Sequence, residues 1–131
     1  MKVLLVNGSP NKKGCTYTAL CEVEKELNKY DIETEIFYIG KKPIRGCTAC
    51  RKCVELGKCV FDDDVVNAAV DKAGKSDGFV FGSPVHYAGA SGFIHHFWIV
   101  VFFPVAMHLS TSRVRQSSVA AVAAQPQRLS N

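Results

Sequence analysis

Four of the six cysteines in this chain lie within the stretch GCTACRKCVELGKC, residues 46–59. They are Cys47, Cys50, Cys53 and Cys59, with the spacing C-x2-C-x2-C-x5-C. Four thiolates can hold one [4Fe–4S] cluster, and close spacing suits it because the ligands must fold around a single cube. The spacing differs from the bacterial ferredoxin run and from zinc ribbons, whose cysteine pairs lie farther apart. Three interpretations therefore stay open: an iron-sulfur cluster, thiols without metal, and a zinc site or disulfide.

Two loops rich in small residues could hold a ligand. The first, GSPNKKGCT from Gly8 to Thr16, leads into a helical pattern, so backbone N–H groups and the helix dipole can converge on a phosphate. It is not a P-loop, because Cys15 stands where that motif needs lysine. The second, SPVHYAGASG, sets His86 and Tyr87 between small residues, which suits a planar heterocycle. Each loop alone is also compatible with an ordinary turn.

The elements around these loops follow an alternating pattern. Short apolar or β-branched segments at 3–6, 32–39 and 78–84 predict strands. Apolar residues at helical spacing predict a helix after Gly14 and another after the three aspartates, over 65–73. Strand, helix, strand, helix, strand indicates an α/β fold with a parallel sheet. Ligands of such sheets bind beyond the carboxyl ends of the strands, where both loops lie, and this geometry matches an FMN site.

The composition changes after Gly92, because residues 93–131 contain no Gly, Lys, Asp or Glu. The apolar run from Phe97 to Met107 is shorter than the roughly 20 residues that span a bilayer, and Pro104 predicts a break in any helix there. Only residues 118–124 could supply a fourth strand, and we expect the end of the chain to be a loose tail. We hypothesise a truncated or frame-shifted sequence after about residue 96.

The composition restricts the class of protein. With 131 residues, 47% of them hydrophobic and 21% charged, the chain is expected to form one globular domain. Its net charge of +4 comes from bases interspersed with acids, which argues against nucleic-acid binding. Only four apolar residues precede Asn7 after the initial lysine, too few for a signal peptide. We therefore expect a cytoplasmic protein, in which disulfides are rare.

Residues 1–96 resemble the flavodoxin-like, NAD(P)H-dependent FMN reductase family, which includes the iron-sulfur flavoproteins. The segments that carry the resemblance are GSPNKKGCT, GCTACRKCVELGKCVFDDD and GSPVHYAGASGFIHHF. The resemblance implies a three-layer α/β/α fold whose parallel sheet is truncated to three or four strands. It divides the chain into an FMN-binding region, 1–96, and an atypical C-terminal segment of the same domain, 97–131.

The resemblance also implies a function and site residues. The chain would bind FMN, take a hydride from NAD(P)H and deliver electrons to a small-molecule or protein acceptor, as a flavin or quinone reductase does. The open edge of a sheet truncated to three or four strands favours a homodimer if the chain folds. No side chain is assigned as catalytic, because the flavin carries the chemistry. The residues around the FMN phosphate would be Ser9, Asn11, Gly14, Cys15 and Thr16. Those along the isoalloxazine would be Pro84, Val85, His86, Tyr87 and Gly89.

Two further functions remain open. In one, the chain is an iron-sulfur flavoprotein, and a [4Fe–4S] cluster on the four cysteines transfers electrons. In the other, it is a non-catalytic, metal-binding remnant of such a protein, an alternative suggested by the altered C-terminal segment.

Overall fold

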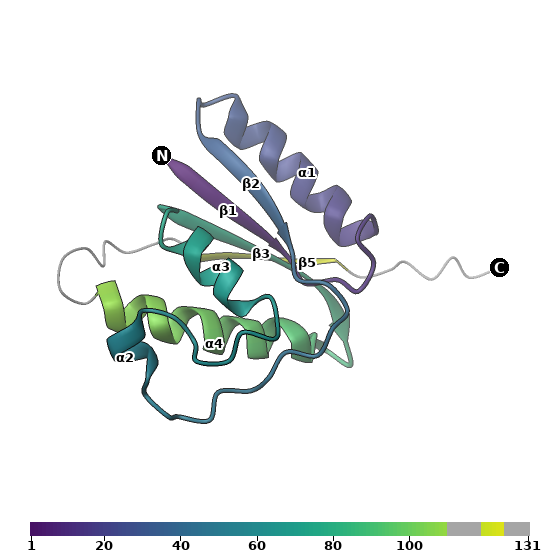
Figure 1. Ribbon diagram of the computed structural model, residues 1–131. Coiled ribbons are helices and arrows are strands. Elements are labelled where there is room, and N and C mark those ends of the chain that lie inside the picture. Colours follow the sequence, from purple (N-terminus) through teal and green to yellow (C-terminus); the bar gives the residue numbers. More distant parts are fainter. Residues whose placement is uncertain (110–118, 125–131) are drawn as a thin grey trace.

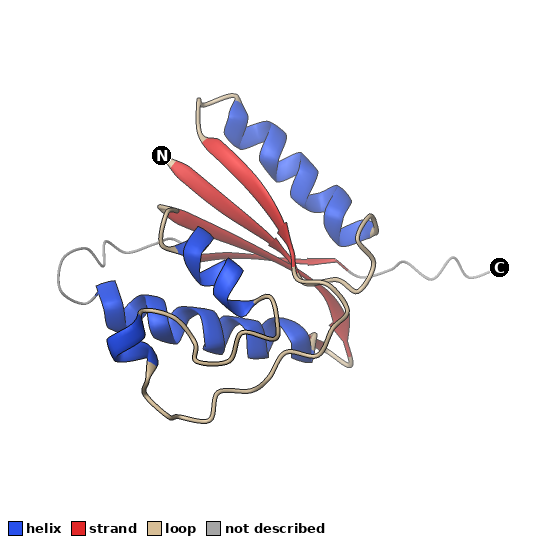
Figure 2. Cartoon of the chain, viewed as in Figure 1, coloured by secondary structure: helices blue, strands red, loops and turns tan. Residues whose placement is uncertain are grey.

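The computed structural model describes residues 1–109 and 119–124, and a parallel sheet forms its centre (Figures 1 and 2). The strands are β1 (Lys2–Asn7), β2 (Glu33–Tyr38), β3 (Gly78–His86), the two-residue β4 (Gly89–Ala90) and β5 (Val119–Ala124). The helices are α1 (Cys15–Asn28), the short α2 (Cys53–Leu56), α3 (Val66–Ala73) and α4 (Gly92–Leu109). The predicted alternation of strands and helices is confirmed.

The sheet has the order expected for a truncated flavodoxin-like fold. Strand β1 pairs in parallel with β2 on one side and with β3 on the other, so that Val6 lies beside Phe37 and Phe81. Strand β5 pairs in parallel with the outer side of β3. A fourth strand is thus confirmed over Val119–Ala124, while the expected tail, 125–131, lies outside the described residues.

Alternating side chains of the strands build a core on each face of the sheet. Helices α3 and α4 cover one face of the sheet and α1 covers the other (Figure 1). Leu4 and Val6 of β1 belong to the core on the first face, whereas Val3 and Leu5 belong to the core under α1. Each of the two faces is covered by a helix, so the central strands are apolar on both sides. The first face has the larger core, to which α4 contributes Ile94, Phe97, Val100 and Val101.

Both predicted helices form where their patterns begin. Helix α1 buries Leu20 against the sheet and half-buries Val23 and Leu27. Tyr30, which fits the same helical spacing, lies beyond the end of α1 and is exposed. Helix α3 begins after Asp64, whose Oδ1 accepts the N–H of Val66 at 2.9 Å.

Helix α4 differs from the expectation that Pro104 would interrupt a helix. It extends from Gly92 to Leu109, through the proline. Proline removes one backbone hydrogen bond from a helix. We attribute the continuation to the packing of the preceding turns, where Phe97 and Val101 are almost completely buried. Within residues 1–109 and 119–124, no helix has the length and apolar character needed to cross a membrane.

Candidate functional site

A completely buried asparagine shapes the loop after β1. Asn7, the last residue of the strand, accepts the backbone N–H of Ser9 through its Oδ1 at 3.1 Å. Its Nδ2 donates to the carbonyl of Lys12 at 3.2 Å. The amide thereby fixes both the start and the middle of the loop, and places the following residues at the carboxyl edge of the sheet.

The N-terminus of α1 opens into a basic cleft beside this loop. The helix is preceded by Gly14, has no side-chain cap and has no acidic residue in its first turn. Its first backbone N–H groups are therefore available to an anion. The cleft is lined by Pro10, Asn11, Lys12, Lys13, Gly14, Tyr38 and Lys41. An uncapped, positive helix end with lysines around it fits the phosphate of a bound nucleotide.

Tyr38, at the end of β2, supports the cleft from the neighbouring strand. Its hydroxyl donates to the carbonyl of Pro10 at 2.9 Å. The ammonium group of Lys12 lies 5.8 Å from the centre of the Tyr38 ring. The tyrosine thus ties the loop after β1 to β2 and lies beside one of the lysines of the cleft.

The predicted phosphate residues have different surroundings. The Ser9 hydroxyl accepts the backbone N–H of Asn11 at 3.1 Å, so it stabilises the loop itself. Cys15 is exposed as the first residue of α1. Thr16 is buried with its methyl group towards β3, because a Cβ added to Gly82 would lie 2.7 Å from Thr16 Cγ2.

The second predicted loop is a tight hairpin at the end of β3. His86 pairs with Gly89, and the two residues between them, Tyr87 and Ala88, have φ values of 47° and 62°. Non-glycine residues rarely adopt such angles, and strained positions of this kind cluster at ligand sites. The side chain of Tyr87 is fully exposed at the tip, while Pro84 and Val85 are half-buried.

Hydrogen bonds join the two loops at the carboxyl edge of the sheet. The backbone N–H of Gly8 donates to the carbonyl of Gly82 at 2.8 Å. The hydroxyl of Ser91, just before α4, donates to the carbonyl of Gly8 at 3.4 Å, and the Ser91 N–H donates to the Ser83 hydroxyl at 3.0 Å. The structure thus brings both predicted loops together, although residues 84–89 do not line the basic cleft.

The four clustered cysteines line one small cavity of about 30 Å³ under α4. Cys53 is buried on α2, Cys59 is half-buried, and Cys47 and Cys50 are exposed. Burial, helped by the neighbouring thiols, raises the pKa of Cys53, which favours its protonated form. All six cysteines of the chain are free thiols.

The cavity fits a thiol-bound metal in the type of its donors but not in their spacing. In the part of the chain that the structure describes, no three His, Cys, Asp or Glu side chains stand close enough to hold one metal ion. Ala49 and Arg51, on either side of Cys50, have φ values of 56° and 60°. The N–H of Ala49 donates to the Cys47 sulfur at 3.4 Å, which tightens this turn.

Sequence reasoning missed several residues that build the site. Asn7, Tyr38, Ser83 and Ser91 position the two loops, and Asn67 of α3 binds the backbone beside Cys59. The signal for Asn7 and Tyr38 was a polar residue at the end of an apolar strand. The partners of Asn67 lie up to eight residues away in a loop, and no local pattern marks them.

Comparison with known proteins assigns the family. The family model described as NADPH-dependent FMN reductase matches residues 1–129, well beyond the 96 residues that carry the recognisable motifs. The chain therefore belongs to the NADPH-dependent FMN reductase family.

Curated relatives share the N-terminal part of the chain. An iron-sulfur flavoprotein of Methanocaldococcus jannaschii is 36% identical over 91 residues, which cover 70% of this chain and 47% of that protein. An iron-sulfur flavoprotein of Clostridioides difficile is 32% identical over 94 residues, covering 70% and 42%. The chain thus spans less than half the length of these two relatives.

Solved structures share the fold at low sequence identity. A flavone reductase superposes with a TM-score of 0.64 and 16% identity, covering 95% of this chain and 43% of that one. An FMN-dependent NADH-azoreductase from Bacillus anthracis, solved in complex with FMN, gives a TM-score of 0.58 and 12% identity, covering 95% and 69%. At these identities the comparison shows the flavodoxin-like fold alone.

Proposed function

We propose that the chain binds FMN at the carboxyl edge of its sheet and acts as an NAD(P)H-dependent oxidoreductase of the flavin or quinone reductase type. The observation that carries this proposal is the joining of the two loops through Gly8, Gly82 and Ser91. One loop leads to an uncapped helix N-terminus, and the other presents an exposed aromatic hairpin. Family membership and the flavin enzymes that share the fold support it.

The residues of the site would divide the work of binding between the two loops. The N–H groups at the start of α1, together with Lys12 and Lys13, would hold the phosphate. Asn7 and Ser9 would keep the loop in shape, and Tyr87 would lie along the ring system. Bound FMN would accept a hydride from the nicotinamide and pass electrons to the acceptor.

An anaerobic absorption spectrum tests this function. Purified chain is titrated with FMN and then treated with NADPH or NADH in separate samples. We expect resolved flavin bands that shift on binding and bleach on addition of the nicotinamide. A folded chain that leaves the FMN spectrum unchanged would contradict the proposal and favour the non-catalytic alternative.

We further propose that the acceptor is a free flavin, a quinone or a protein, and that the chain works as a homodimer. A reducing compartment such as the cytoplasm suits a protein whose cysteines are free thiols.

A second candidate function is favoured by the four thiols on one cavity. In this proposal the cysteine segment, residues 46–59, binds an iron-sulfur cluster, which is supported by its similarity to iron-sulfur flavoproteins. Binding would require the four thiols to come closer together, since their present spacing does not hold a metal.

Anaerobic reconstitution with ferrous iron and sulfide tests this second function. A cluster would add a broad absorption that bleaches with dithionite, and Cys50→Ala would reduce both the iron content and this absorption. Cys21→Ala, on α1 and away from the cavity, is the matched control and should load like the wild type. Full iron loading by Cys50→Ala would count against the cluster.

A further inference from the structure

The side-chain amide of Asn67 pairs with the backbone of Cys59 from both sides. Its Oδ1 accepts the Cys59 N–H at 2.8 Å, and its Nδ2 donates to the Cys59 carbonyl at 3.0 Å. The same Nδ2 reaches the carbonyl of Phe61 at 3.2 Å and Oδ1 of Asp62 at 2.9 Å. One side chain thus holds four groups of the segment that carries the last of the clustered cysteines.

Helix α3 makes Asn67 a rigid support. Two nearby residues of the same helix, Val66 and Ala69, have no exposed surface and belong to the larger core. Cys59 itself packs against that core. A backbone pinned to such a helix cannot move without breaking these hydrogen bonds or opening the core.

Arg45 makes a second link between the two ends of the cysteine segment, residues 46–59. Its guanidinium lies 4.4 Å from the centre of the Phe61 ring and pairs with Asp63 at 3.0 Å. These contacts bring the two ends of the cysteine segment together. Between them, Cys47 and Cys50 stand on an exposed turn.

We propose that Asn67 is a positioning residue that fixes Cys59 at the wall of the thiol cavity. The cavity then consists of two fixed cysteines, Cys53 on α2 and Cys59 beside α3, and of two on an exposed turn, Cys47 and Cys50. The inference goes beyond FMN binding and holds whether the cysteines take a metal or remain thiols.

Site-resolved alkylation of the metal-free full chain tests this role. Folded protein is treated with iodoacetamide, unfolded at successive times and labelled with an isotopic form of the reagent, and peptide mass spectrometry gives the rate at each cysteine. Losing several hydrogen bonds frees the Cys59 backbone, so we expect Asn67→Ala to raise the Cys59 rate about tenfold or more. The rates at Cys53 and Cys21 should change far less.

Two further variants separate positioning from general stability. Asn67→Asp keeps the shape of the side chain but loses the N–H donors of Nδ2, which reach three acceptors, so it should raise the Cys59 rate as Asn67→Ala does. The Asn67→Asp variant also allows the proposal to be tested if Asn67→Ala fails to fold. Asp71→Asn, also on α3, alters only an exposed pair with Lys75 just beyond the helix and should leave every rate unchanged.

Three outcomes would overturn the proposal. Equal increases at Cys59, Cys53 and Cys21 would mean that Asn67 contributes only to global stability. An unchanged Cys59 rate in Asn67→Ala would mean that the bonds do not hold the segment. Wild-type behaviour of Asn67→Asp would mean that the amide donors play no part.

Discussion

Tyr38 shows how a single hydroxyl can control the candidate phosphate site. It belongs to β2, yet it bonds to the carbonyl of Pro10 in the loop after β1. Together with the buried amide of Asn7, it fixes the loop before any ligand arrives. A loop that is already ordered loses less entropy on binding, so these residues should raise ligand affinity without touching the ligand.

We expect Tyr38→Phe to weaken FMN binding. The substitution removes one neutral hydrogen bond and leaves the aromatic ring in place, so the dissociation constant should rise by about two- to tenfold, corresponding to roughly 0.5–1.5 kcal/mol. Quenching of FMN fluorescence measures the constant. Tyr30→Phe, at an exposed position outside α1, is the control and should bind like the wild type. Equal affinity of the Tyr38 variant and the wild type would exclude this role.

The crossing of α1 over β3 determines how closely the two loops approach each other. At this crossing Gly82 lies under Thr16 and Leu20. The carbonyl of Gly82 also accepts the backbone N–H of Gly8, which joins β3 to the loop after β1. A Cβ on Gly82 would lie 2.7 Å from Thr16 Cγ2 and 3.1 Å from Leu20 Cδ1. The absence of a side chain here allows the helix start and the sheet edge to meet.

Gly82→Ala should therefore destabilise the fold and the site together. Overpacking a tight contact costs about 1–3 kcal/mol of unfolding free energy. Urea denaturation followed by circular dichroism measures the loss. Gly74→Ala is the control, because a Cβ there meets only ordinary contacts at 3.5 Å and beyond. Similar stability of the two variants would show that the contact at Gly82 relaxes without cost.

Elements in which apolar residues recur at a regular spacing could be predicted from the sequence. Elements that depend on contacts with distant residues could not. Continuous apolar runs predicted β1 and β3, and helical spacing predicted α1 and α3. Helix α4 was expected to break at Pro104, because local propensity does not include the packing of Phe97 and Val101 against the sheet. The spacing of the cysteines left a cluster, free thiols and zinc or a disulfide open, and it did not predict that Cys53 is buried while Cys47 and Cys50 are exposed.

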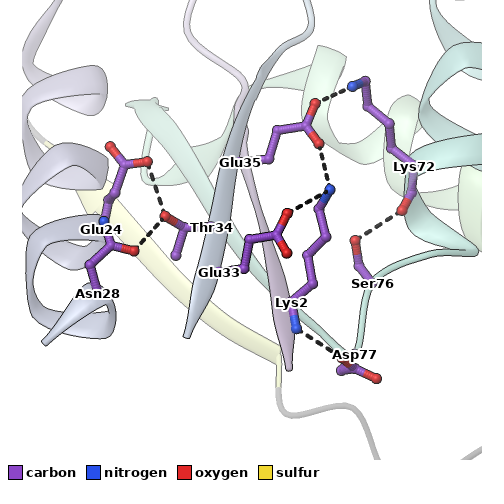
Figure 3. A network of polar contacts seen from close by, with 9 residues as sticks. All are labelled: Lys2, Glu24, Asn28, Glu33, Thr34, Glu35, Lys72, Ser76 and Asp77. Atoms are coloured by element: carbon purple, nitrogen blue, oxygen red, sulfur yellow. Dashed lines mark hydrogen bonds and ion pairs between the residues drawn. The ribbon is translucent and has the colours of Figure 1, made fainter. Parts of the chain in front are cut away.

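For the whole molecule, the two ends of the sheet have different roles. The carboxyl ends carry the candidate site, while the amino ends carry an ionic network (Figure 3). There Glu35 pairs with Lys72 of α3 and with Lys2 at 3.1 Å, and the backbone of Lys2 bonds to Asp77. The network joins β1, β2 and α3 away from the loops, so it can stabilise the fold without involving the site.

This network should make stability depend on pH. The bond to Lys72, followed by that to Lys2, lowers the pKa of Glu35. A lowered carboxyl pKa contributes stability above the unfolded value of about 4.3, and this contribution is lost as the pH falls through the folded value. The wild type should therefore exceed Glu35→Gln in unfolding free energy at neutral pH, and the difference should shrink in acid.

Urea denaturation at neutral pH and at about pH 3 measures this difference on both sides of the carboxyl titration. Glu33→Gln, which removes a more exposed carboxylate 3.5 Å from Lys2, is the control and should show a smaller effect. A difference for Glu35→Gln that stays constant or grows in acid would contradict the assignment.

We propose that the loop after β1 and the start of α1 recognise the phosphate of a bound flavin. Competition between FMN and riboflavin tests it most directly, because the two differ only in that phosphate. Titrations of the wild-type chain, followed by flavin fluorescence, should show tight binding of FMN and at least about tenfold weaker binding of riboflavin, the loss expected from removing charge-assisted hydrogen bonds. Equal affinities for the two flavins, or no binding of either, would contradict phosphate recognition at this loop.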